Sequence, residues 1–233
     1  MHARGPLLST RGVNMSIQEL FSLYGGMYVK AYGATLWMTV VSYVGAMLLA
    51  LLVTIARVSP ISPLRKVGDL YVQIFRNVAT ISLLIIFYYA FPYLGVVWSE
   101  QTCVIVVTVL VAASFGSENF MTGINTIGVG QIEAARSLGL SFRQMLKNVV
   151  IPQALRSSVL PMTNLLVAVM LTTAIGSQVP LDPQELTGLV SYINTMSVGG
   201  ILPFAVSAVL YAGTAFLIGL AGNAIDKRVR ILR

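Results

Sequence analysis

Charged residues are scarce in this chain of 233 residues: only 10% are Asp, Glu, Lys or Arg, whereas 56% are hydrophobic. Soluble domains carry roughly 25% charged residues, so this chain lacks the polar surface that a water-facing globule needs. The mean hydropathy of +0.82 supports the same conclusion. A lipid bilayer is the natural solvent for such a composition, and we expect an all-α membrane protein.

Cysteine and histidine each occur once, as Cys103 and His2. A single cysteine excludes an intramolecular disulfide and a cysteine-based zinc cluster, and we expect Cys103 to be packed in the core. A single histidine excludes His-based dyads, triads and metal clusters. The motifs G-x-x-x-x-G-K-[ST], H-E-x-x-H and G-x-S-x-G are also missing from the sequence. The chain therefore cannot cradle the phosphates of ATP, and neither an enzyme activity nor a cofactor of its own is expected.

The few charges are spaced so that long stretches carry none. Five such intervals contain 26, 23, 17, 25 and 40 residues, and a helix needs roughly 20 apolar residues to cross about 30 Å of hydrocarbon. Only the second half of the last interval is apolar enough to span. The sequence therefore predicts five transmembrane helices in a domain over residues 31–233. Their expected ranges are 33–56, 71–92, 101–120, 158–179 and 201–223.

Lysine and arginine are distributed unevenly among the connecting segments. If the C-terminus is cytoplasmic, the cytoplasmic segments hold 12 of the 15 basic residues, and the outside loops after the second and fourth helices hold none. This positive-inside bias places the N-terminus outside the membrane. The net charge of +7 thus indicates topology, and no nucleic-acid partner is expected.

Two polar stretches lie outside these spans. Residues 1–30 are expected to form a flexible leader and an interfacial segment, and the first fourteen lack the apolar core of a secretion signal. Residues 179–200 form an outside loop that is polar and long enough to receive another protein. An ordinary re-entrant or interfacial segment is an equal alternative for this loop.

Residues 130–155, GQIEAARSLGLSFRQMLKNVVIPQAL, fall on the predicted cytoplasmic side between the third and fourth spans. Ser141 and Gln144 have the spacing of a capping box, and an amphipathic helix should follow until Pro152 ends it. Upstream, residues 131–138 form a shorter helical piece, and Gly139 supplies a permissive backbone for the turn. Such a helix–turn–helix either lies on lipid or docks in a groove of a soluble partner, and periodicity leaves both open.

The motif EAARSLGL…VVIPQAL resembles the EAA loop of the membrane-spanning subunits of ATP-binding-cassette importers. With the five-helix layout, the chain is more narrowly similar to permeases of polar amino acid importers, the histidine/glutamine/glutamate group, over residues 31–230. The resemblance implies a multi-pass protein of the bacterial cytoplasmic membrane. It also implies a coupling helix seated on an ATPase subunit, formed by Glu133, Ala134, Ala135 and Gly139.

The same resemblance implies the partners. ATP and Mg²⁺ would be bound by separate ATPase subunits, and a second permease subunit and an extracytoplasmic solute-binding protein would complete the importer. The cargo would be a polar amino acid, with a preference for glutamate or glutamine. This chain departs from the family at Val78-Ala79, where relatives have Thr-Pro, at Val167-Ala168-Val169, where they carry a lysine, and at Met121, where they carry an arginine. Because intramembrane charges tend to be functional, their loss favours a heterodimer.

Six polar residues are candidates for the substrate path. Each position also has a purely structural explanation. Arg and Glu side chains near helix ends often extend to the membrane surface or form ion pairs. Hydroxyl groups often donate hydrogen bonds to backbone carbonyls of their own helix. Thr173 and Ser177 are four residues apart and should share a helix face. The candidates are Arg76, Glu118, Asn164, Thr172, Thr173 and Ser177. The competing hypothesis is a self-contained secondary carrier or a membrane scaffold protein, although a carrier should show inverted repeats, which the sequence lacks.

Overall fold

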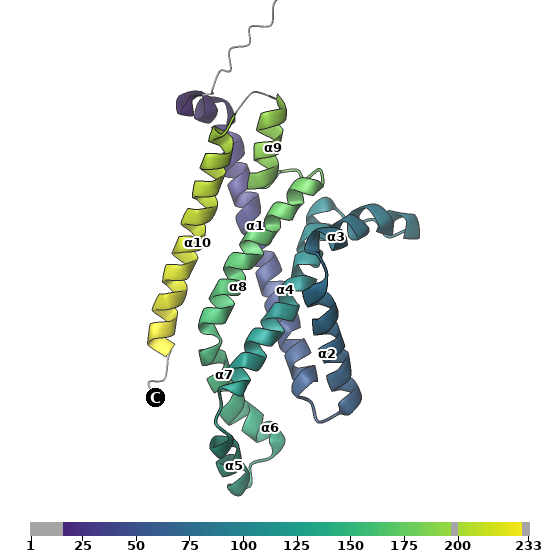
Figure 1. Cartoon of the computed structure of the whole chain (residues 1–233), viewed down its shortest axis with the longest axis vertical. Helices are drawn as coiled ribbons and strands as arrows, with labels where there is room; N and C mark the ends of the chain where they lie inside the picture. Colours follow the sequence, from purple (N-terminus) through teal and green to yellow (C-terminus); the bar gives the residue numbers. More distant parts are fainter. Residues whose placement is uncertain (1–15, 197–199, 230–233) are drawn as a thin grey trace, which may run out of the picture.

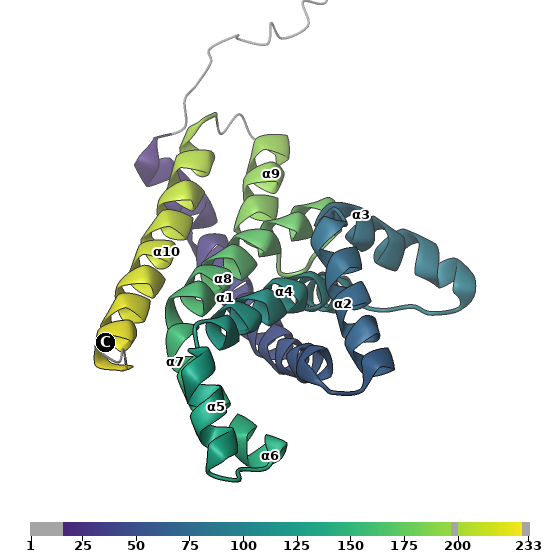
Figure 2. The ribbon, with the colours of Figure 1, turned by 60° about the horizontal axis from the view of Figure 1, so that its bottom comes forward.

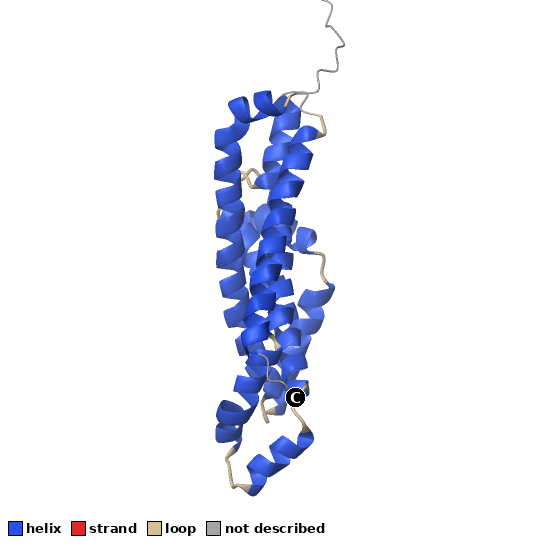
Figure 3. Ribbon diagram, turned by 90° about the vertical axis from the view of Figure 1, so that its left-hand side faces the viewer, coloured by secondary structure: helices blue, strands red, loops and turns tan. Residues whose placement is uncertain are grey.

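The computed structural model describes residues 16–196 and 200–229, and the elements within these ranges are helical. Four helices are long and apolar enough to cross a membrane, and they run along the long axis of the molecule (Figure 1, Figure 3). The all-α prediction is confirmed. The four are α1 (Ile17–Val58), α4 (Glu100–Asn125), the segment Val159–Gln178 made of α8 (Val159–Thr172) and η4 (Thr173–Gln178), and α10 (Leu202–Val229).

The second predicted span, over residues 71–92, is not one continuous helix. The chain forms α2 (Ser62–Asn77) and then α3 (Thr80–Ile85), η1 (Ile86–Ala90) and η2 (Phe91–Leu94), with a bend of 97° between the two parts. Val78 and Ala79 are extended at the bend, and the Asn77 side-chain amide donates to the Gln73 carbonyl at 2.6 Å. The described residues therefore contain four spans, or five if the bent pair is one crossing.

The first helix begins much earlier than expected. Ser16 caps α1 in a capping box: its hydroxyl accepts from the Glu19 N–H at 3.2 Å, and its own N–H donates to the Glu19 carboxylate at 2.9 Å. Residues 17–30 are therefore helical and continuous with the first span, and the interfacial position of this segment stays a prediction. The prediction for residues 1–14 lies outside the described residues.

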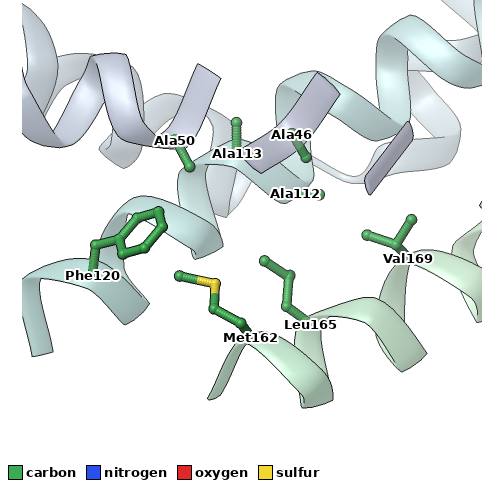
Figure 4. Close-up of a cluster of buried hydrophobic side chains, with 8 residues drawn as sticks. All are labelled: Ala46, Ala50, Ala112, Ala113, Phe120, Met162, Leu165 and Val169. Atoms are coloured by element: carbon green, nitrogen blue, oxygen red, sulfur yellow. The ribbon is translucent and has the colours of Figure 1, made fainter. Parts of the chain in front are cut away.

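Small side chains allow α1, α4 and α8 to pack closely. Ala46 and Ala50 of α1 face Ala112 and Ala113 of α4, and longer side chains of α4 and α8 close the cluster (Figure 4). A Cβ placed on Gly116 would lie 2.8 Å from the Cβ of Ala50, so only glycine fits at this crossing. Alanine and glycine serve this role in membrane helices because packing and not water exclusion holds them together. The longer side chains are Phe120, Met162, Leu165 and Val169.

A short helix, α9 (Leu186–Met196), fills one end of the bundle (Figure 1). Its Leu186, Leu189 and Ile193 are buried against Leu20, Tyr28 and Ala31 of α1. With 11 residues and a rise of about 1.5 Å each, α9 is too short to cross a bilayer. Nearby, Cys103 is buried in an apolar cluster of α1, α3 and α4, which confirms its predicted core position.

The last helix, α10, lies at the side of the bundle and packs mainly against α8 and α9 (Figure 1). Most of its large apolar side chains are exposed, among them Val209, Phe216 and Leu217. Its contact with α8 depends on Gly222, because a Cβ there would overlap the Thr163 side chain. Gly219, one turn away on the same helix, faces open space.

These two glycines give a matched test of the packing between α8 and α10. We expect Gly222→Ala to destabilise the protein by about 1–3 kcal/mol, because the added methyl group overpacks the contact with Thr163. Gly219→Ala adds the same methyl group without a neighbour and should be neutral or slightly stabilising. Thermal unfolding in detergent measures both; equal midpoints for the two variants would contradict this packing.

Candidate functional site

The segment between α4 and α8 forms a helical hairpin at the end of the molecule opposite α9 (Figure 1, Figure 2). It contains α5 (Val129–Ser137), α6 (Phe142–Met145), the π-helical turn η3 (Leu146–Val150) and α7 (Ile151–Ser157). The hairpin closes over a small core of its own, in which Ala135 contacts Ile127, Met145 and Val150. It is thus a folded unit that projects beyond the long helices.

Gly139 makes the turn that joins the two arms of the hairpin. Its φ is +73°, a left-handed conformation that glycine adopts without strain. The Gly139 N–H donates to the Arg136 carbonyl at 2.9 Å, and the Leu140 N–H donates to the Ala135 carbonyl at 3.2 Å. These two bonds form a Schellman motif, which ends α5 and satisfies its last carbonyls. The permissive turn predicted at Gly139 is therefore present.

The second arm begins as predicted but does not end at Pro152. The capping box is complete: the Ser141 hydroxyl accepts from the Gln144 N–H, and the Gln144 side chain accepts from the Ser141 N–H. The helix then widens into η3, where the Ile151 N–H bonds the Leu146 carbonyl five residues back. A wider turn makes room for a proline ring that would clash with the carbonyl of residue i−4 in a regular α-helix. The chain therefore continues through Pro152 into α7.

The four predicted coupling residues divide into two groups. Ala135 is buried inside the hairpin and Gly139 forms its turn, so both shape the unit. Glu133 and Ala134 are exposed on α5. Val129 and Leu138, which the sequence analysis did not select, are 70% and 80% exposed at the two ends of α5. We call Val129, Glu133, Ala134 and Leu138 the α5 surface. Val129 and Leu138 are nine residues apart, about half a turn from each other around the helix axis, so the α5 surface runs around the exposed side of the helix.

A second group of polar side chains meets between α1, α2 and α4. Arg57 at the end of α1 binds Asp69 of α2 through Nε at 2.9 Å and Glu118 of α4 through Nη2 at 2.8 Å. Its Nη1 also donates to the Ser117 hydroxyl at 3.2 Å. Arg76 of α2 approaches the same oxygen of Glu118 at 3.6 Å. Two cations and two anions therefore form one connected network.

This network lines a cavity of about 480 Å³, which we call the ionic cavity. The sequence predicts Arg76 and Glu118 as residues of the substrate path, and the structure places them in contact. Arg57 and Asp69 are not among the predicted path residues, because Arg57 is counted with the cytoplasmic basic residues that indicate topology. The sequence does carry a signal for this pair: Arg57 ends the first apolar span, and the Asp69 carboxylate follows twelve residues later on the next helix. The walls of the cavity also include Val72, Gln73, Asn77 and Phe115.

The other four predicted path residues do not join the ionic cavity. Asn164 is exposed on α8, and the hydroxyls of Thr172, Thr173 and Ser177 each donate to a carbonyl of their own helix, at 2.7–2.8 Å. Thr173 and Ser177 lie in η4, a 3₁₀-helix with three residues per turn, so residues four apart do not share a face. Accordingly Thr173 is buried, whereas Ser177 lines a separate cavity of about 340 Å³ beside α9.

Glu185 is fully buried at the start of α9 and also lines that separate cavity. Its carboxylate accepts hydrogen bonds from the backbone N–H groups of Thr187 and Gly188 and from the Tyr211 hydroxyl, the last at 3.3 Å. Burial raises the pKa of the Glu185 carboxyl above its ordinary value of 4.5, and these hydrogen bonds oppose the rise. Residues 179–196 thus form a packed cap, of which α9 is the main part. Across the ranges 16–196 and 200–229, no cluster of three metal-ligating side chains occurs.

Comparisons with known proteins assign the chain to a family. The family model described as "Binding-protein-dependent transport system inner membrane component" matches residues 46–231. The glutamate transport system permease protein GluC of Corynebacterium efficiens is 30% identical over 183 residues, covering 73% of this chain and 80% of that protein. The L-cystine transport system permease protein TcyB of Bacillus subtilis is 29% identical over 208 residues, covering 89% of this chain and 86% of that one.

A solved structure shares the fold. The crystal structure of an amino acid ABC transporter with histidines superposes with a TM-score of 0.83, covering 89% of this chain and 96% of the other. The two sequences are 21% identical.

The buried Glu185 predicts a dependence of stability on pH. Its pKa is higher in the folded than in the unfolded state, so this group favours folding most below about pH 4.5, and that contribution is lost as pH rises through the folded pKa. We expect Glu185→Gln to unfold at a temperature that changes less with pH above 4.5 than that of the parent protein. Tyr211→Phe removes a donor that favours the ionised carboxylate and should steepen the dependence. Parallel pH profiles for all three proteins would contradict this assignment.

Proposed function

This chain belongs to the family of binding-protein-dependent transport system inner membrane components, and we propose that it imports a polar amino acid as one permease subunit of an ABC transporter. Permeases of this family are the non-catalytic membrane component, and ATP hydrolysis is carried out by separate subunits. The long apolar helices make it a multi-pass membrane protein. ATP and Mg²⁺ therefore belong to the partner subunits.

The observation that carries this proposal is the α5 surface. It combines exposed apolar side chains, Val129 and Leu138, with the Glu133 carboxylate, on a hairpin that projects from the membrane helices. A short exposed helix on a projecting hairpin can enter a groove on a protein partner. We propose that the partner is an ATPase subunit and that α5 is the coupling helix.

The orientation follows from charge. Arg136, Arg143, Lys147 and Arg156 lie on the hairpin and its continuation, whereas the segment beside α9 carries Asp182 and Glu185. The positive-inside rule then places the hairpin in the cytoplasm and α9 at the outer face. Under this orientation an extracytoplasmic solute-binding protein would dock at the α9 end. The exposed polar residues there include Asp182, Ser191, Asn194 and Thr195.

Glutamate or glutamine is the substrate that we favour. Support comes from GluC, which is named for glutamate transport, while TcyB is named for L-cystine, so both share the class of polar amino acids. A second permease subunit is expected, and we favour a different chain over a copy of this one. Val167, Ala168 and Val169 leave this stretch of α8 without the charge expected there, and a partner would supply the missing polar groups.

Charge reversal on the α5 surface tests the coupling role. We expect Glu133→Lys to reduce ATP-driven uptake by the reconstituted importer by at least about tenfold, because an interface residue of this kind contributes on the order of 1–2 kcal/mol. Membrane insertion and the ATPase activity of the separate subunits should remain. Asp226→Lys, the same reversal on α10 away from the hairpin, serves as the control. Equal uptake by the two variants would contradict the coupling role of α5.

The turn at Gly139 tests whether the shape of the hairpin matters. Gly139→Ala forces a residue with a Cβ into φ +73° and should cost about 1–2 kcal/mol locally, although the space around it is open. We expect faster amide hydrogen exchange in α5 and weaker retention of the ATPase subunit. Gly130→Ala, inside α5 and also in open space, should slow exchange or leave it unchanged. Slower exchange in Gly139→Ala would show that the Schellman turn is dispensable.

A further inference from the structure

The two arginines of the ionic cavity differ in how firmly they are held. Arg57 is 13% exposed and is bound to two carboxylates at 2.9 and 2.8 Å and to the Ser117 hydroxyl at 3.2 Å. Arg76 is 43% exposed, and its ion pair with Glu118 is longer, at 3.6 Å. Its guanidinium lies 5.6 Å from the centre of the Phe115 ring. Arg57 is therefore a structural clamp, whereas Arg76 presents its charge to the cavity.

The two carboxylates of the ionic cavity, Asp69 and Glu118, each use one oxygen for their ion pairs. Both ion pairs of Glu118 use Oε1, and the ion pair of Asp69 uses Oδ1. We call Glu118 Oε2 and Asp69 Oδ2 the outer oxygens. Asp69 is 47% exposed and Glu118 32% exposed. The cavity thus presents one partly exposed cation, Arg76, and two partly exposed carboxylates.

We infer that the ionic cavity binds the backbone of a free amino acid, with its α-carboxylate on Arg76 and its α-ammonium on the outer oxygens of Glu118 and Asp69. This inference rests on the proposed import of an amino acid and adds which part of the substrate this subunit recognises. All α-amino acids share the α-carboxylate and the α-ammonium group, so this recognition does not depend on the substrate's side chain. The side chain of the substrate would face the amides of Gln73 and Asn77, which both donate and accept hydrogen bonds.

Charge balance is the reason that a zwitterion fits better than a simple anion or cation. The two arginines and two carboxylates sum to zero, and the weak Arg76–Glu118 contact is replaced by one ion pair at each end of the ligand. When the ligand binds, Glu118 keeps its 2.8 Å ion pair with Arg57, so its carboxylate remains paired with a cation. A ligand with only one charge would pair with Arg76 or with the carboxylates but not with both, so it would displace the Arg76–Glu118 contact without replacing it at both ends.

The size of the cavity agrees with this ligand class. At about 480 Å³ it lies within the range of roughly 300–1,000 Å³ typical of small-molecule sites. The cavity also lies beside the bend between α2 and α3, because Arg76 and Asn77 are the last residues of α2. Phe115 and Val72 provide an apolar wall against which the aliphatic part of the ligand packs.

Binding is tested on the complete complex of this chain with its partner subunits, purified in detergent without the solute-binding protein. The unfolding temperature of the complex is measured with each protein amino acid. The best ligand is then compared with its methyl ester, which lacks the carboxylate, and with its 2-oxo acid, which lacks the ammonium group. We expect at least one amino acid to stabilise the complex and neither analogue to do so. Stabilisation by either analogue to the same extent, or by no amino acid, would overturn the inference.

Arg76→Gln is the decisive variant, because Glu118 remains paired with Arg57 and the fold should persist. It should raise the dissociation constant of the best ligand on the order of 10- to 100-fold, the effect of losing a charge-assisted hydrogen bond. Arg65→Gln, the same change on an exposed position of α2, should bind as the parent does. Glu118→Gln should weaken binding similarly, and Glu100→Gln at the other end of α4 is its control. Unchanged affinity in Arg76→Gln would refute the site.

Two further measurements separate this inference from the proposed function. If the parent complex drives ATP-dependent uptake but Arg76→Gln transports and binds equally well, the site is wrong and the function stands. If the chain never co-purifies with an ATPase subunit, the proposed function fails, and the inference fails with it.

Discussion

The close approach of α1 and α4 determines where the polar groups of this protein meet. Gly45 accommodates Val109, and Gly116 accommodates Ala50, because a Cβ on either glycine would lie within 3 Å of its neighbour. With the helix axes held this near, Arg57 at the end of α1 reaches both Glu118 and Ser117 of α4. A larger residue at the crossing would separate the helices and break an ion pair in a region where its charges are costly to expose. The apolar packing of α1 against α4 therefore also determines the geometry of the ionic cavity.

The same helix that carries Glu118 also supports the hairpin. Five residues further along α4, a Cβ on Gly123 would lie 2.7 Å from the Ala154 carbonyl of α7, so the two backbones touch. The Ser158 hydroxyl adds a bond to the Asn119 carbonyl at 3.3 Å. The hairpin thus joins α4 at its start and packs against α4 again through α7. The hairpin is therefore anchored to α4 at two places and is not a free loop.

Sequence reasoning recovered what depends on local chemistry. The Ser141–Gln144 capping box and the glycine turn at Gly139 each follow from a few neighbouring residues, and both are present. Features that depend on tertiary packing were missed. The pairing of Arg57 with Asp69 requires knowing that α2 folds back along α1. The π-helical turn before Pro152 and the 3₁₀ turn at Thr173 alter the helical period that the face assignments assumed.

The break between α2 and α3 shows why apolar length alone did not predict the bend within the second span. Charge-free residues after Arg76 suggested one helix, but extended residues at Val78 and Ala79 turn the chain by 97°. A bend of this kind leaves backbone groups without helical partners, which a membrane tolerates only where they face protein or a water-filled cavity. The ionic cavity lies at this point, lined by the last turn of α2. The break and the charges are therefore found together, because polar side chains that line the cavity lie on the last turn of α2, where the helix stops.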